Sequence, residues 1–408
     1  HLFNPIIHCI IRYMKEVKKV AFVHEIFPSG GAERVTCDIA TALLERGGYE
    51  VYVLTLKFNS EMLPADLASD KRFHVIASEN TDVRYLSDIP DFIVDNVRAN
   101  GISSVVFVVQ RLHDVADELK RMGCHTIYAN HGPAFWEVPD RRQRVRLKAR
   151  RSRAKTIKYY LFKYLRYEVL HVLERRWNKF YKQDLDHFDD YMVLCDGYRD
   201  QIVHNLKLSS ADASRIHVIP NMQQPATDLC YDKRKEFLFV GRLSYADKRI
   251  DRLIDAWRMI YDKLPDWSLV IVGEGPDRKR LESMAEGLPR LSFEGYQKPD
   301  EYYRHASALC LVSEYEGFPL CLIEAQSHGV VPISFETSDG VRSIVGNDGS
   351  AGMLVPKGNV RAFADKMLEF AALDEDTKLR LRHQVVAKSL EYSPERVGQM
   401  WVDLLNKE

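Results

Sequence analysis

The sequence lacks long apolar stretches and paired cysteine motifs. No apolar run approaches the roughly 20 residues that a membrane-spanning helix needs, so the sequence predicts no membrane span. The seven cysteines are an odd number without a C-x-x-C pair, which argues against a disulfide framework and against a zinc site. We therefore expect reduced thiols and a cytoplasmic protein.

The chain also lacks a net charge, because 58 Lys and Arg residues balance 58 Asp and Glu residues. This balance hides one strongly basic segment. Residues 141–182 contain 16 Lys or Arg but only two carboxylates, Glu168 and Glu174, so that their net charge is +14. Such an asymmetry suggests a surface for an anionic partner, and a solvated basic helix is the alternative.

The pattern of short strands predicts two α/β domains. With 46% hydrophobic content, 408 residues are enough for two cores, and single cores rarely grow beyond a few hundred residues. Short β-branched runs alternate with amphipathic helical stretches, as is typical of parallel βαβ units. The predicted strands have the sequences KKVAFVHEI, YEVYVLTL, SSVVFVVQ, HTIYANH, DDYMVLCD and RIHVIPN, and then EFLFVGR, WSLVIVGEG, RLSFEGY, ALCLVSE and VVPISF.

The domain boundaries follow from this alternation. We predict one doubly wound domain over residues 15–221, interrupted by a basic helical insertion at about 139–187. A second doubly wound domain is predicted over residues 222–390. Residues 391–408 are expected to form a helix that returns toward the first domain.

Candidate ligand-binding residues follow the predicted strands. Open α/β sheets bind ligands beyond the carboxyl ends of their strands, so we expect a cleft shared by the two domains. Gly30 and Gly31 precede a helix and would let backbone N–H groups approach an anion, with an ordinary turn as the alternative. Arg242 and Lys248 suit a diphosphate, with ordinary surface ion pairs as the alternative.

The stretch SEYEGFPLCLIEAQSHGVVPI contains two glutamates eight positions apart. Pro319 favours the first turn of a helix, so we expect the helix to start there, with Glu316 just outside it and Glu324 inside. At helical rise this interval spans on the order of 10 Å. The two carboxylates are therefore expected to bind two parts of one long ligand.

This stretch resembles the Glu-x7-Glu signature of retaining GT-B glycosyltransferases, in particular glycosyltransferase family 4. The segments GGAERV, FVGRLSYADK, LVIVGEGP, LSFEGY and GMLVP occur in the order and approximate spacing of that family. The resemblance implies an α/β GT-B fold with two doubly wound, Rossmann-like domains facing a central cleft. The first domain would bind the acceptor, and the second would bind a nucleotide-sugar donor.

The resemblance also implies roles for individual residues. Glu316 would hydrogen-bond the donor sugar, Glu324 would hold the ribose hydroxyls, and Arg242 and Lys248 would neutralise the diphosphate leaving group. The other implied contacts are the pyrophosphate with Gly30 and Gly31, the sugar with His131, the sugar and distal phosphate with the backbone of Gly317, Phe318, Pro319 and Leu320, and the base with Gly295 and Tyr296. For His131, a loop histidine without a role is the alternative. One departure is Lys248-Arg249, where the family commonly has Lys-Gly.

The implied function is transfer of a sugar, with retention of configuration, from a UDP-sugar to a glycan or lipid-linked glycan. We expect no metal and no other cofactor, because fixed cations can stabilise the leaving phosphate and no D-x-D pair stands at a plausible position. A sugar-nucleotide epimerase or isomerase and a non-catalytic protein that binds an anionic partner are the alternatives. We expect no nucleic acid partner.

Residues 141–182 also contain many apolar side chains among their cations. This combination suits the anionic inner face of a membrane, with the rings at headgroup level. A solvated or oligomer-forming helical hairpin whose aromatic side chains pack on the first domain is the alternative. The apolar residues are Tyr160, Leu161, Phe162, Tyr164, Leu165, Leu170 and Trp177.

Overall fold

The computed structural model describes residues 17–79, 82–149, 152, 156–157 and 159–407. The chain divides into two compact units. Unit 1 comprises the described residues up to Ile219 and those from Gly398 onward, and unit 2 is Pro220–Val397. Residues 15, 16 and 408 of the predicted domain ranges lie outside the described residues, as does part of the predicted basic insertion.

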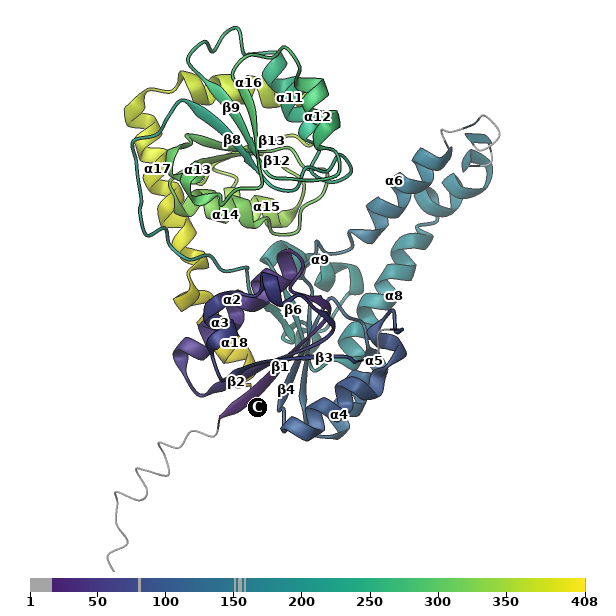
Figure 1. The fold of residues 1–408 in the computed structure, drawn as a ribbon. Coiled ribbons are helices and arrows are strands. Elements are labelled where there is room, and N and C mark those ends of the chain that lie inside the picture. Colours follow the sequence, from purple (N-terminus) through teal and green to yellow (C-terminus); the bar gives the residue numbers. More distant parts are fainter. Residues whose placement is uncertain (1–16, 80–81, 150–151, 153–155, 158, 408) are drawn as a thin grey trace, which may run out of the picture. The chain divides into compact units, whose positions relative to one another are not determined.

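Unit 1 is built on a seven-stranded parallel sheet with the order β3-β2-β1-β4-β5-β6-β7 (Figure 1). The centre of strand β1 is covered on both faces, so its residues from Val20 to Val23 are fully buried and apolar. The strands are β1 (Lys18–Phe27), β2 (Tyr49–Phe58), β3 (Phe73–Ala77), β4 (Ser104–Val108), β5 (His125–Ala129), β6 (Asp190–Val193) and β7 (Ile216–Val218).

Helices connect the strands of unit 1. Pro90 at the first helical position and Gly101 with φ of 63° just after the helix mark the two ends of α4. The helical elements are α2 (Gly31–Arg46), η1 (Ser60–Met62), α3 (Ala65–Ser69), η2 (Leu86–Asp88), α4 (Pro90–Asn100), α5 (His113–Arg121), α6 (Glu137–Ala149), the π-type helix η3 (Tyr159–Val169), α8 (Val172–His187), α9 (Asp196–Leu206) and α10 (Ser210–Ala213).

Unit 2 has a six-stranded parallel sheet with the order β10-β9-β8-β11-β12-β13. Trp257 and Trp267 pack on Phe237 of β8, with the Phe237 and Trp267 ring centroids 4.6 Å apart. The strands are β8 (Glu236–Val240), β9 (Ser268–Val272), β10 (Leu291–Gly295), β11 (Ala308–Leu311), β12 (Val331–Phe335) and β13 (Met353–Val355). The helical elements are α11 (Ile250–Arg258), α12 (Arg278–Ala285), α13 (Asp300–His305), α14 (Leu320–Ser327), α15 (Asp339–Val345), α16 (Val360–Ala372), α17 (Glu375–Ser389) and η4 (Leu390–Tyr392).

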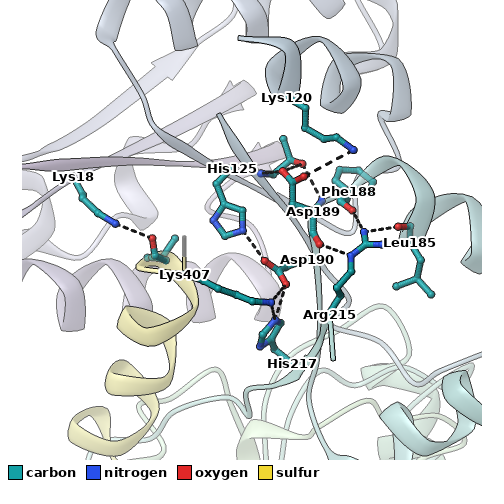
Figure 2. Close-up of polar contacts among 12 residues, drawn as sticks. Lys18, Lys120, His125, Leu185, Phe188, Asp189, Asp190, Arg215, His217 and Lys407 are labelled. Carbon is teal, nitrogen blue, oxygen red and sulfur yellow. Dashed lines mark hydrogen bonds and ion pairs between the residues drawn. The ribbon is translucent and has the colours of Figure 1, made fainter. Parts of the chain in front are cut away.

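The C-terminal helix α18 (Pro394–Leu405) packs on unit 1. The rings of Phe22 in β1 and Trp401 in α18 meet edge to face, with centroids 6.1 Å apart. Lys18 donates a hydrogen bond from Nζ to the carbonyl oxygen of Leu405 at 3.2 Å (Figure 2). The last helix is therefore joined to the first strand by apolar and polar contacts.

A buried carboxylate ties the end of the chain to the sheet of unit 1. Asp190 at the start of β6 is 4% exposed and accepts hydrogen bonds from His125 and His217, each at 2.7 Å (Figure 2). Lys407 reaches the same carboxylate at 2.7 Å from beyond α18. Burial opposes the charge on Asp190, but these three partners outweigh it and hold the pKa of Asp190 well below its usual range.

Two sequence expectations concern cysteines and membrane spans. The six cysteines in the described part of the chain are all free thiols. Among the same residues, no helix combines the length and the apolar character needed to cross a membrane.

Candidate functional site

The strand order places several of the predicted residues at one edge of the unit 2 sheet. The order reverses between β8 and β11, and open parallel sheets bind ligands beyond the carboxyl ends of the strands at such a reversal. Arg242 and Lys248 lie in the loop after β8, whereas Glu316 lies in the loop after β11. Lys248 and Glu316 are 68 positions apart in the sequence. The topology explains how two such distant residues come together.

Lys248 and Glu316 form a direct ion pair. The Lys248 ammonium donates to Glu316 Oε1 at 2.6 Å, and the two side chains are 23% and 9% exposed. Burial disfavours the charged ammonium, but the Glu316 carboxylate outweighs it and raises the pKa of Lys248 above its usual value. Lys248 is therefore a fixed cation at neutral pH, and Glu316 sets its position.

Arg242 lies in the same loop and pairs with a different carboxylate. Its Nη2 donates to Asp247 Oδ2 at 2.7 Å, and the Arg242 side chain is 66% exposed. Burial works against the charge on Asp247, yet hydrogen bonds from Ser244 and Arg242 lower the pKa of Asp247 overall. The guanidinium is thus held by one edge while most of its surface faces solvent, where it can meet an anion.

Glu324 occupies a buried position in α14. This helix begins at Leu320, one residue later than predicted, because Pro319 has the extended ψ of 117° and precedes the first helical turn. Glu324 is 5% exposed, and Tyr303 donates a hydrogen bond to its Oε2 at 2.8 Å. The phenol fixes the orientation of the carboxylate.

The turn between the two glutamates is held from several sides. Phe318 is buried, packs on Tyr392 with ring centroids 5.4 Å apart, and accepts a hydrogen bond at its carbonyl from Asn221 Nδ2 at 3.0 Å. Ser338 donates to the Gly317 carbonyl at 3.5 Å. These partners come from distant parts of the sequence and order the backbone of the turn.

Gly295 ends β10 in a conformation that favours glycine. Its φ is 74°, and a Cβ there would lie 3.0 Å from Arg278 Nη1 and 3.1 Å from Glu274 Oε1. The next side chain, Tyr296, is 84% exposed. The predicted base-contacting residues thus combine a turn that favours glycine with an exposed aromatic ring.

In unit 1, the predicted residues also follow strands. Gly30 caps α2 with an extended backbone, and Gly31 is the first residue of that helix. A Cβ at Gly31 would have no protein atom within 4 Å, so packing against the described residues does not require glycine there. His131 follows β5 and is half-buried, next to Asn130, whose Oδ1 accepts a hydrogen bond from the Gly132 N–H at 3.1 Å.

A cavity of about 280 Å³ lies beside the His131 loop within unit 1. Its wall combines amide and carboxylate groups with an aromatic ring, and such groups suit the hydroxyls and apolar faces of a sugar. The lining residues are Ala134, Phe135, Val138, Pro139, Glu174, Asn178, Gln201 and Asn205. No local pattern in the sequence indicated this cavity, because its residues come from three separate stretches.

Sequence reasoning assigned no role to Glu314, which organises the loop that carries Glu316. Its carboxylate pairs with Arg252 of α11 at 2.5 Å and with Lys357 at 3.2 Å. Burial opposes the charge on Glu314, but these cations outweigh it and lower the pKa of Glu314. The SEYEG stretch offered a third carboxylate as a signal, but its partners could not be identified from spacing.

The glycines of VGEGP are required by close backbone approach. A Cβ at Gly273 would lie 1.9 Å from the Gly241 carbonyl oxygen, and one at Gly275 would lie 2.3 Å from that of Leu243. The two loops that follow β8 and β9 therefore touch through their backbones. The G-x-G spacing was a usable signal for this contact.

Arg249 occupies a position where the family that the sequence resembles commonly has glycine. Its backbone conformation explains why glycine is favoured there. Its φ of 50° and ψ of 42° lie in the left-handed region just before α11. The arginine compensates through two hydrogen bonds to Asp251 at 3.0 and 2.9 Å and through its position over the Tyr245 ring. The substitution therefore keeps the Lys248 loop in the shape that glycine would favour.

Metal binding was not expected. Across the residues whose placement is described, no group of three or more His, Cys, Asp or Glu side chains is arranged to hold a metal ion. The independence of the reaction from metal stays a prediction, as do the roles of the individual site residues.

The chain is similar to proteins of known family and fold. Residues 223–387 match the family model of glycosyl transferases group 1. An uncharacterized glycosyltransferase of Haemophilus influenzae is 29% identical over 195 residues, which cover 46% of this chain and 53% of that protein. The amylovoran biosynthesis glycosyltransferase AmsD of Erwinia amylovora is 26% identical over 235 residues, covering 52% and 64%. The alignments thus span between half and two thirds of the length of these curated relatives.

The solved structures include Anabaena Alr3699/HepE in complex with UDP and glucose, which covers 95% of this chain and 99% of its own. The TM-score is 0.68 at 16% sequence identity, a likeness that shows the fold. The predicted α/β class and the two Rossmann-like sheets are confirmed. The chain has the GT-B fold, and its residues 223–387 match the model of glycosyl transferases group 1.

Proposed function

We propose that the protein is a glycosyltransferase that transfers a sugar from a nucleotide-sugar donor to a glycan or lipid-linked glycan. The observation that carries this proposal is the half-buried ion pair of Lys248 and Glu316, which lie in the loops after the carboxyl ends of β8 and β11. These residues lie within the segment that matches the glycosyl transferases group 1 model. A cation and a carboxylate held side by side suit a donor that combines a diphosphate with a sugar.

The chemistry we propose depends on fixed charge. When the bond between sugar and diphosphate breaks, negative charge develops on the phosphate, and Arg242 and Lys248 would stabilise it directly. Glu316 would hydrogen-bond the sugar, and Glu324 the ribose hydroxyls. We propose that the acceptor attacks with retention of configuration and that no metal takes part.

The choice of donor rests on similarity alone. We propose a UDP-sugar, because the related HepE structure contains UDP and glucose. For the acceptor, the name of AmsD refers to biosynthesis of amylovoran, which supports a role in polysaccharide synthesis.

The test is incubation of the full chain with a panel of nucleotide sugars and glycan acceptors. We expect one donor to yield free nucleoside diphosphate and a new glycoside, with activity unchanged by a chelator. Glu316→Gln should lose this activity, whereas Glu369→Gln, which changes an exposed glutamate of α16 in the same way, should keep it.

Two results would overturn the proposal. Conversion of the free nucleotide sugar into an isomer, without a new glycoside, would indicate an epimerase or isomerase. Equal product formation by Glu316→Gln and the parent would show that the reaction takes place elsewhere. Loss of activity with chelator and recovery with Mg²⁺ would contradict the metal-free scheme alone.

A further inference from the structure

The basic insertion folds as a hairpin of α6, η3 and α8, which we call the insertion hairpin. Helices α6 and α8 run alongside each other, and η3 lies toward the end of the pair that is far from the sheet of unit 1 (Figure 1). A small apolar cluster of Val145 and Tyr159, with Tyr167 packed against it, joins α6 to η3. One side of η3 is thus occupied by the hairpin itself.

The other side of η3 exposes apolar side chains at high density. The described residues include 20 large apolar side chains that are exposed, and eight of them lie between positions 157 and 170. Leu161 and Phe162 are 64% and 67% exposed. Single exposed apolar residues are ordinary, but a continuous group of them marks an interaction surface. The eight are Ile157, Tyr160, Leu161, Phe162, Tyr164, Leu165, Val169 and Leu170.

In the insertion hairpin, two carboxylates lie in ion pairs within the hairpin, whereas two cations of η3 are exposed on its surface. Both carboxylates of residues 141–182 are used internally: Glu168 pairs with Arg146 at 2.9 Å, and Glu174 pairs with Arg142. Lys163 and Arg166 are exposed on η3, and neither pairs with a carboxylate of the described chain. The apolar surface is therefore accompanied by cations that have no compensating charge beside them.

We propose that the insertion hairpin docks on an anionic membrane surface, with the apolar side chains of η3 at headgroup level. Aromatic rings and leucines enter the interfacial region readily, and lysine and arginine meet anionic lipid there. A second copy of the chain fits less well, because each copy would bring the same net charge of +14 in residues 141–182. This proposal rests on the surface alone and is independent of the proposed transferase activity.

The first test is sedimentation of the full chain with vesicles. At low ionic strength, the protein should sediment with phosphatidylcholine vesicles that contain phosphatidylglycerol and stay in the supernatant with pure phosphatidylcholine. Raised salt should release it, because screening shortens the range of the attraction to less than about 10 Å. Equal recovery in the supernatant with both vesicles at low salt would overturn the proposal.

Matched variants identify the surface. Lys163→Glu/Arg166→Glu should weaken partition into anionic vesicles by at least about tenfold, whereas Lys263→Glu/Lys279→Glu in unit 2 should stay within about twofold. Leu161→Ser/Phe162→Ser should also weaken partition by about tenfold. For the apolar pair, the control is the exposed unit 2 pair Leu379→Ser/Leu390→Ser.

Two outcomes with the variants would contradict the proposal. Partition of both hairpin variants equal to that of the parent would show that another surface binds the vesicles. A change in sedimentation coefficient of the free protein, without a change in vesicle binding, would identify η3 as an interface between copies. Thermal unfolding of each variant should match the parent, since these side chains are exposed.

Discussion

At the scale of single residues, Glu316 forms an ion pair with Lys248. Removing the charge of Glu316 therefore also changes the surroundings of the Lys248 ammonium. Glu316→Gln keeps the size and one hydrogen-bond acceptor. We expect kcat to fall by about 100-fold or more, because the carboxylate is proposed to contact the sugar as charge develops. Affinity for UDP should stay within about threefold, measured by calorimetry. An unchanged kcat with a proven donor would contradict this role.

Glu324 should show the opposite pattern. Its carboxylate is proposed to bind the ribose, and a hydrogen bond to a charged group contributes about 1.5–3 kcal/mol. Glu324→Ala should therefore weaken UDP binding by about 10- to 100-fold in calorimetry. Tyr303→Phe removes only the hydroxyl group that orients the carboxylate, and it should weaken the free energy of UDP binding by about 1 kcal/mol. Equal affinity of the alanine variant and the parent would exclude the ribose contact.

Arg249 allows a test of backbone strain. At a φ of 50°, alanine retains the strain and glycine does not, so Arg249→Gly should be more stable than Arg249→Ala by about 1 kcal/mol. Urea unfolding of both variants measures this difference. At the exposed Arg380 inside α17, the order should reverse, because glycine is about 1 kcal/mol worse than alanine in a helix interior. The same order at both positions would refute the strain argument.

The sequence identified site residues where local signals exist and failed where partners are distant. Pro319 and the two glutamates could be interpreted from helix-start chemistry. Asp247 and Tyr303 could not, because their roles depend on contacts with Arg242 and Glu324 that only the folded chain creates. The individual roles of the site residues stay predictions.

At the scale of elements, the prediction of strands depended on burial. The eleven predicted strands all correspond to strands of the structure, since buried parallel strands read as apolar runs. Strands β3 and β13 were not predicted. Both lie at sheet edges, and most of their side chains are only partly buried, so the apolar signal is weak. The start of α14 was wrong by one residue.

The Asp190 cluster joins β5, β6 and β7 to the segment after α18 and should make unit 1 sensitive to acid. The pKa of Asp190 is depressed in the folded state, so its stabilisation is fully present above the unfolded value of about 3.9 and is lost as pH falls below it. Asp190→Asn should lower the free energy of unfolding by about 3 kcal/mol at neutral pH. Its unfolding should also depend less on pH below about 5.

Urea unfolding across this pH range is the measurement. The control is Asp186→Asn, which breaks the exposed pair with Lys182 and should cost no more than about 1 kcal/mol. If Asp190→Asn unfolds with the free energy and pH slope of the parent, the cluster is not a source of stability.

At the scale of the whole molecule, ligand binding should stabilise one of the two units more than the other. Length and alternation indicated two sheets, but the order of strands cannot be deduced from periodicity, because it does not say which strands pair. In unit 2, that order brings Arg242, Lys248 and Glu316, which are proposed to contact the donor, to one edge of the sheet. UDP at 100 times its Kd should stabilise that unit by about 2.7 kcal/mol.

Hydrogen exchange would show which unit the nucleotide stabilises. With UDP bound, we expect slower exchange of the amides at 242–248 and 317–324 and little change in β1, β2 and β3. Inosine monophosphate, which lacks the second phosphate and has a different base, is a suitable control ligand. Protection confined to unit 1 would mean that the nucleotide binds elsewhere.

The contact of α18 with β1 implies an order of events during protein synthesis. Lys18 and Leu405 are separated by 387 positions, and all of unit 2 is translated between them. The strands of unit 1 therefore emerge from the ribosome first, whereas Trp401, which covers Phe22, emerges only after unit 2. Unit 2 can fold as an uninterrupted stretch before unit 1 is complete. A nascent chain stalled before residue 398 would leave an apolar surface of β1 open to chaperones.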